Sequence, residues 1–131
     1  MKSRDNLLRL KHFQVQEKTR QLAQIDMMIA EFMRMSDDLQ HQIEVEEKKA
    51  GITDQSHFAY PTFAKAAHGR KENLAGSING LQEKRIAAEE ALNEADEELK
   101  NAQLKETRDG GTGILADPVV DEAVERRMMI G

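Results

Sequence analysis

The fold is decided by the stretch LRLKHFQVQEKTRQLAQIDMMIAEFMRMSDDLQHQI, which runs from Leu8 to Ile43. Its apolar residues recur at an interval of seven, so the stretch can be written as heptads whose first (a) and fourth (d) positions form one stripe. The a positions are Leu8, Val15, Leu22, Ile29, Ser36 and Ile43, and the d positions are Lys11, Lys18, Ile25, Phe32, Leu39 and, just beyond, Glu46. This period keeps the stripe turned toward a partner helix, so the stretch predicts one helix of a coiled coil.

A second stretch repeats the pattern with smaller side chains. Its a positions are Lys71, Ile78, Arg85, Leu92 and Leu99, and its d positions are Ala67, Leu74, Leu81, Ala88, Ala95 and Ala102. Alanines at d let two helix backbones approach closely. We therefore predict that the two stretches pack against each other through their a and d positions, which we call the seam.

The residues between the two stretches predict an antiparallel hairpin. Gly51 suits the left-handed position that ends a helix, and Pro61 suits the first position of the next one. A linker of about ten residues is too short to return along a helix of about 60 Å, so packed helices must run in opposite directions. Residues 1–20 carry six bases and two acids, whereas residues 81–106 carry eight acids and four bases. Such exposed charges favour this orientation more than they stabilise it.

The predicted fold class is thus all-α, a long two-helix antiparallel coiled-coil hairpin over residues 1–107. We expect helices at about 7–50 and 61–107, a turn at 51–60, and the tightest packing between Ile25 and Ile43. Residues 108–131 predict a Gly-containing linker followed by a short amphipathic helix at residues 118–129, with a disordered tail as the alternative. Gly69, Gly76 and Gly80 interrupt the second helix, either to relieve crowding or to allow bending or the close approach of a partner.

Composition excludes several classes of protein. With 131 residues, 33% charged residues and 4% aromatic residues, the chain is poorly suited to a globular core. It has no Cys and no apolar run long enough for a signal peptide or a membrane span, so we expect a cytoplasmic protein without membrane insertion. The net charge of -5 argues against nucleic-acid binding.

No arrangement of residues indicates catalysis, a cofactor or a metal. Antiparallel pairing would bring His41 and His68 near each other across the seam, where a bridged metal is conceivable, but zinc sites need three or four ligands and we expect surface histidines. Residues 110–113 lack the Lys and Ser/Thr of a phosphate loop, and the acids of residues 94–98 suit a solvated helix face. We therefore expect no enzymatic activity and no cofactor.

Apolar residues outside the seam are the more informative signal. Leu7, Leu10 and Phe13 cluster near the basic beginning of the chain, and four methionines follow at positions 27, 28, 33 and 35. They predict a surface that binds a protein partner, although a wider stripe covering the thin alanine helix would also explain Met28, Met33 and Met35.

Three segments resemble the flagellar export protein FliJ of the alphaproteobacterial type. They are the opening MKSRDNLLRLK (residues 1–11), the segment FQVQEK (13–18), and the turn with AGITD (50–54) and HFAYPTFAKA (57–66). The resemblance extends to about Glu106 and leaves out the Gly-rich joint. It implies a coiled coil similar in shape to the central stalk of rotary ATPases, which works with the hexameric ATPase of the flagellar type III export apparatus, the cytoplasmic part of the export gate, and export chaperones.

With this resemblance, the candidate sites fall into two groups. Those for the ATPase are Arg4, Leu7, Arg9, Leu10, Lys11 and Phe13, and those for the export gate are Phe58, Tyr60 and Phe63. The alternative for the aromatic residues is that they simply pack the turn. The rivals to a stalk or adaptor are a holdase-like export chaperone, which clamps unfolded substrates, and a self-associating structural coiled coil.

Overall fold

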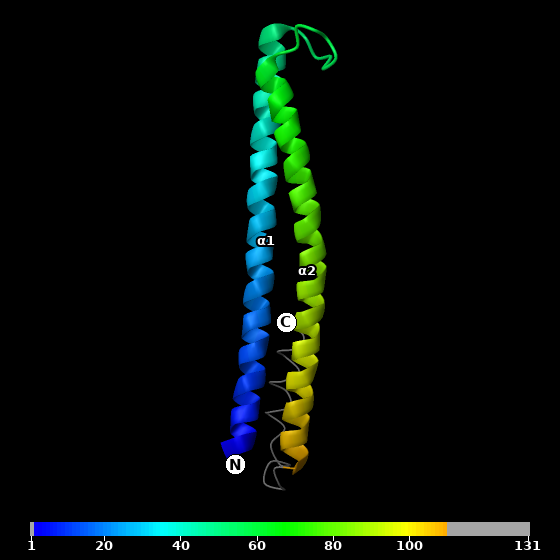
Figure 1. Cartoon of the computed structure of the whole chain (residues 1–131). Helices are drawn as coiled ribbons and strands as arrows, with labels where there is room; N and C mark the ends of the chain where they lie inside the picture. The colour runs from blue at the N-terminus through cyan, green and yellow to red at the C-terminus, as the bar shows by residue number, and fades with distance from the viewer. Residues whose placement is uncertain (1, 110–131) are drawn as a thin grey trace. The chain divides into compact units, whose positions relative to one another are not determined.

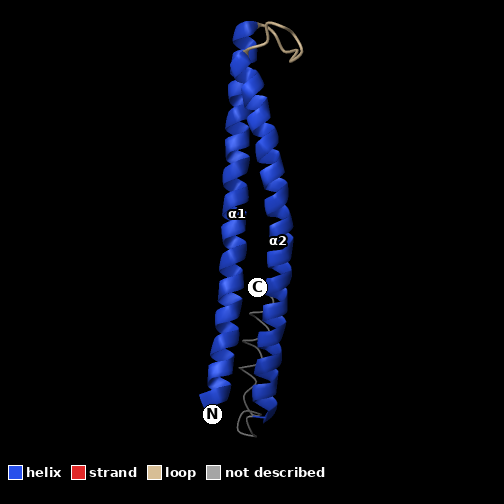
Figure 2. Ribbon diagram, viewed as in Figure 1, coloured by secondary structure: helices blue, strands red, loops and turns tan. Residues whose placement is uncertain are grey.

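The computed structural model describes residues 2–109, which form two long helices, α1 (Lys2–Ala50) and α2 (Thr62–Asp109), joined by a turn (Figure 1, Figure 2). This part of the chain contains no strand, and the predicted all-α hairpin is confirmed. The short helix predicted at residues 118–129 lies outside the described residues.

Each helix contributes to two compact units. The first, which we call the turn unit, comprises residues 18–91, and the second, the terminal unit, comprises residues 1–17 and 92–131, described for 2–17 and 92–109. In the turn unit Asp26 contacts Arg85 and Gln40 contacts Lys71, so residue numbers fall on α2 as they rise on α1. Contact between Lys11 and Glu98 fits the same antiparallel direction within the terminal unit.

The seam lies where the heptads predict it. Every predicted a and d position of both helices is buried or half-buried, including polar ones such as Lys18 and Glu46. Most seam side chains remain only half-buried, because two helices cover only one side of each other's apolar stripe. The period of seven therefore predicted the packing face at the level of single residues in both units.

The tightest packing is at the turn. Ile43, Ala64 and Ala67 are at most 1% exposed, Tyr60 is 7% exposed, and Leu39 and Ile52 pack against them. The sequence predicted the best packing over the whole stretch from Ile25 to Ile43, and this is wrong for its first part, since Ile25 is only half-buried. The difference arises because the turn supplies a third layer over Ile43.

The helix ends differ from the predicted ones by a few residues. Helix α1 begins five residues before Leu7, because helical hydrogen bonds continue beyond the last apolar contact where no Pro or Gly stops them. At its other end, Gly51 has φ 71° and donates a 2.8 Å hydrogen bond to the carbonyl of Glu47, which confirms its predicted role. Helix α2 begins at Thr62, one residue after Pro61, whose carbonyl accepts a hydrogen bond from the amide of Lys65.

The glycines of α2 do not relieve crowding within the described chain. A Cβ atom added at Gly69, Gly76 or Gly80 would meet no atom within 4 Å. Each glycine costs about 1 kcal/mol relative to Ala in a helix interior. Of the two explanations that the sequence leaves open, crowding is therefore wrong.

Candidate interaction surfaces

The terminal unit exposes the apolar residues that the sequence singled out. Leu7, Leu10 and Phe13 each leave about half of their surface in solvent, and Arg9 is exposed beside them. Because residues three and four apart share a helix face, Arg9 and Leu10 both neighbour Phe13. These three side chains form one mixed surface on α1, with a cation next to an aromatic ring.

The other three candidates for the ATPase side lie closer to α2. Lys11 is half-buried, and its Nζ lies 3.1 Å from Oε1 of Glu98, so an ion pair crosses the seam. Arg4 and Leu7 help to line a shallow pocket of about 330 Å³. The six residues around this pocket are Arg4, Leu7, Leu8, Ala102, Lys105 and Glu106. The candidates thus fall into an outer surface and a pocket rim.

Sequence reasoning missed the contribution of α2 to this region. Leu104 is exposed, and Lys105 lies on the pocket rim. The signal was present, because Leu104 is an apolar residue outside the seam, as Phe13 is.

The turn holds its aromatic residues in three different environments. Phe58 is 97% exposed and its ring stacks on His57, with centroids 4.8 Å apart. Phe63 is half exposed on α2, whereas Tyr60 is in the core. Of the three candidates for the export gate, Phe58 and Phe63 are accessible to a partner, and Tyr60 packs the turn.

Tyr60 also anchors the turn through its hydroxyl. This group donates a 2.7 Å hydrogen bond to Oε2 of Glu47, and its oxygen lies 3.1 Å from Nε2 of His68. Desolvation, together with the hydrogen bond and negative charge of Glu47, raises the pKa of Tyr60 to about 12. The neutral phenol is therefore held between the last turn of α1 and the second turn of α2.

Local hydrogen bonds fix the exposed part of the turn. The side chain of Asp54 accepts bonds from the hydroxyl and the amide of Ser56, which lower the pKa of Asp54. Nδ1 of His57 accepts a bond from the amide of Ala59, and the carbonyl of His57 accepts one from the amide of Tyr60. Phe58 is therefore displayed on a backbone that its neighbours order.

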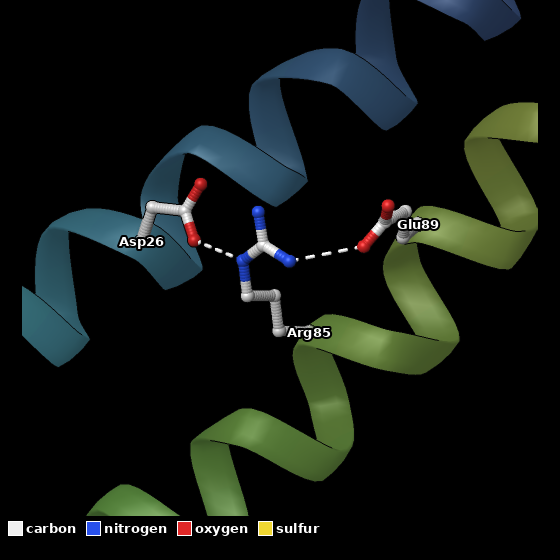
Figure 3. A network of polar contacts seen from close by, with 3 residues as sticks. All are labelled: Asp26, Arg85 and Glu89. Carbon is white, nitrogen blue, oxygen red and sulfur yellow. Dashed lines mark hydrogen bonds and ion pairs between the residues drawn. The ribbon is translucent and has the colours of Figure 1, made fainter.

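A polar network crosses the seam in the middle of the turn unit. The guanidinium of Arg85 donates hydrogen bonds to Asp26 on α1, at 2.5 Å, and to Glu89 on its own helix, at 2.9 Å (Figure 3). The contact with Asp26 is the main reason that the pKa of Arg85 is raised. Gln40 accepts a 2.6 Å hydrogen bond from Lys71 at another polar seam position. Arg85 and Lys71 are thus cationic residues of the seam, and each donates a hydrogen bond to a polar side chain on α1.

Four methionines of α1 are exposed, but they do not all share one helix face: Met28 and Met35, seven residues apart, lie on the same face, and Met27 and Met33 lie on others. Met27, Met28, Met33 and Met35 are all exposed, so the neighbouring α2 does not cover them. Flexible thioether side chains adapt to partners of different shape. These side chains are therefore accessible to a protein partner within the turn unit.

The described residues offer no metal centre and no membrane span. Between residues 2 and 109, no three side chains from His, Cys, Asp and Glu come together in a way that could hold an ion. His68 faces Tyr60, while His41 is exposed. Neither α1 nor α2 has a segment apolar enough to cross a bilayer. In comparisons with known proteins, the chain matches no family model, no curated protein and no solved structure.

Proposed function

We propose that this chain is a non-enzymatic stalk and adaptor of the flagellar type III export apparatus, which binds the export ATPase ring and the export gate. It would act in the cytoplasm, associated peripherally with the export apparatus. The proposal starts from the resemblance to FliJ in the opening segment and the turn. Its main structural support is the surface of Arg9, Leu10 and Phe13, which two packed helices leave uncovered.

The chemistry of this surface suits a protein partner with acidic groups beside an apolar pocket. Binding energy at protein interfaces concentrates in a few aromatic and Arg side chains surrounded by less important contacts. Phe13 supplies the aromatic group and Arg9 the guanidinium, on one face of α1. We assign these two residues the largest share of ATPase binding.

The turn supplies a second, separate surface. Phe58 projects from an ordered backbone, and Phe63 is exposed on the first turn of α2. We assign both to the export gate, with Tyr60 supporting the turn beneath them. Two surfaces with different chemistry are what an adaptor between two proteins requires.

Binding to the purified export ATPase tests the proposal. Phe13→Ala and Arg9→Glu should each weaken binding by about tenfold or more, the usual effect of losing an interface anchor. Ile86→Ala and Arg70→Glu are matched controls, because both residues are exposed on α2 in the turn unit. The full chain should also change the rate of ATP hydrolysis by the ATPase. Unchanged binding by both Phe13→Ala and Arg9→Glu would overturn the assignment of the surface.

The exposed methionines favour one alternative, a holdase-like export chaperone. Met27, Met28, Met33 and Met35 could hold unfolded export substrates of varied sequence. Affinity capture from lysate separates the two functions. Recovery of a hexameric ATPase supports the stalk, and a spread of unfolded clients, reduced by replacing the four methionines with Gln, supports the chaperone. Recovery of the chain alone would support a self-associating coiled coil.

A further inference from the structure

The pocket of the terminal unit is lined by both apolar and charged side chains. Leu7, Leu8 and Ala102 supply the apolar part, and two cations, Arg4 and Lys105, outnumber one acid, Glu106, among the charged residues around it. Its volume of about 330 Å³ is at the low end of the range of about 300–1,000 Å³ for pockets that hold small ligands. It is therefore large enough for a few aliphatic side chains.

One segment of the chain has the complementary chemistry. Residues 114–124 read ILADPVVDEAV, a segment with seven aliphatic residues (Ile, Leu, Val and Ala) and three acids. Over residues 117–125 there are four acids and no base. An aliphatic segment bearing negative charge is complementary to a pocket that is lined by apolar side chains and has a net positive charge.

The attachment point of this segment lies close to the pocket. Asp109 ends α2 only seven residues after Ala102, a distance of about 10 Å along the helix axis. The five residues 110–114 can span up to about 17 Å, and three of them are Gly. The segment can therefore return to the pocket without stretching its tether.

We propose that residues 114–124 fold back and occupy the pocket of the terminal unit, with their aliphatic side chains on Leu7 and Leu8 and their acids toward Arg4 and Lys105. A tether of this length gives the segment a local concentration in the millimolar range. A second copy of the chain would instead lose translational and rotational freedom on binding. The tether therefore favours the chain's own segment over a second copy, and the contact does not depend on the proposed function.

Disulfide formation in the full chain tests this contact, because the natural sequence has no Cys to interfere. Ser3 is exposed and lies one helical turn before Leu7, so Ser3→Cys with Val119→Cys places one thiol beside the pocket and the other in the segment. The matched control pairs Val119→Cys with Gln16→Cys, an exposed position on α1 about 13 Å beyond Leu7. We expect the first pair to form its intramolecular disulfide about tenfold faster, because docking would raise the effective concentration of the Val119 thiol beside Ser3 but not beside Gln16.

Charge reversal provides the second measurement. Asp121→Lys with Glu122→Lys should reduce the rate advantage of the Ser3 pair severalfold, and adding Arg4→Glu and Lys105→Glu should restore much of it. Equal rates for the two pairs in the original background would overturn the proposal. So would a disulfide-linked dimer whose yield rises with protein concentration, since a second copy would then be the occupant.

Discussion

The hydroxyl of Tyr60 donates a 2.7 Å hydrogen bond to Glu47, and this bond ties the end of the turn to the last turn of α1. The ring of Tyr60 lies in the core with Ile43, Ala64 and Ala67, so packing and hydrogen bonding act on the same side chain. The best-packed part of the described chain is thus built around its single tyrosine.

The first prediction concerns the titration of Tyr60. Since the chain has one Tyr and no Trp, the absorbance of tyrosinate reports this group alone. In the folded chain we expect a pKa of about 12, because desolvation and Glu47 both oppose ionisation. In denaturant it should return to about 10. Glu47→Gln should lower the folded value, and a folded pKa near 10 would contradict the contact.

The same shift predicts how stability depends on alkaline pH. The pKa of Tyr60 is higher in the folded chain than in the unfolded chain, so its contribution is complete below about pH 10 and is lost as the pH rises toward about 12. Urea unfolding, followed by helical circular dichroism at several pH values, measures this loss. Tyr60→Phe should show a smaller fall over that window, since it cannot ionise. Identical falls for the two proteins would count against the prediction.

The second group of variants tests the glycines of α2. Gly69→Ala, Gly76→Ala and Gly80→Ala should each stabilise the isolated chain by about 0.5–1 kcal/mol, because a Cβ has open space and Ala favours the helix. Gly51→Ala is the control and should destabilise by about 1–2 kcal/mol, because its φ of 71° is left-handed. The free energy of unfolding in urea measures all four. Destabilisation by the α2 variants would show that their environment differs from the one described.

Core packing gives a sharp contrast between two isoleucines. Ile43→Ala should destabilise by about 2–5 kcal/mol, since the side chain is 1% exposed and its removal leaves a cavity under the turn. Ile86→Ala should change stability by no more than about 0.5 kcal/mol, because Ile86 is 60% exposed. The midpoints of urea unfolding compare them directly. Equal effects would place the core elsewhere.

The contact between Asp26 and Arg85 should contribute in a salt-dependent way. Both side chains remain partly exposed, so screening by salt reduces their attraction. A double-mutant cycle with Asp26→Asn and Arg85→Gln should give a favourable coupling at low ionic strength that shrinks as NaCl is added. A coupling that does not change with salt would indicate that the hydrogen bond, rather than charge, dominates.

The sequence predicted the packing face much better than the ends and the turn. A strict interval of seven places Leu22, Ile29 and Leu81 without ambiguity, because a helix has only one face with that period. It says little about where a helix stops, since backbone hydrogen bonds continue past the seam. The separation of Tyr60 from Phe58 could not be predicted either, because neighbouring aromatic residues in a turn carry no periodic signal.

The glycines show a different limit of sequence reasoning. The presence of Gly at positions 69, 76 and 80 indicates a cost in helix propensity, but it does not give the distance from an added Cβ to the nearest atom. The sequence alone therefore does not distinguish relief of crowding from access for a partner, whereas the open space around each added Cβ excludes crowding. The pocket between α1 and α2 in the terminal unit could not be predicted for a related reason, since Lys105 and Ala102 become neighbours of Leu7 only through pairing of the helices.

The ordered display of Phe58 has a kinetic consequence. The bonds made by Asp54 and His57 fix the backbone of the turn before any partner arrives, so little entropy remains to be lost there on binding. A preorganised aromatic ring binds a partner in one conformation. Substitutions at or near such a contact alter mainly the dissociation rate of the complex. Asp54→Ala would therefore shorten the residence time of a bound partner, even though Asp54 need never touch it.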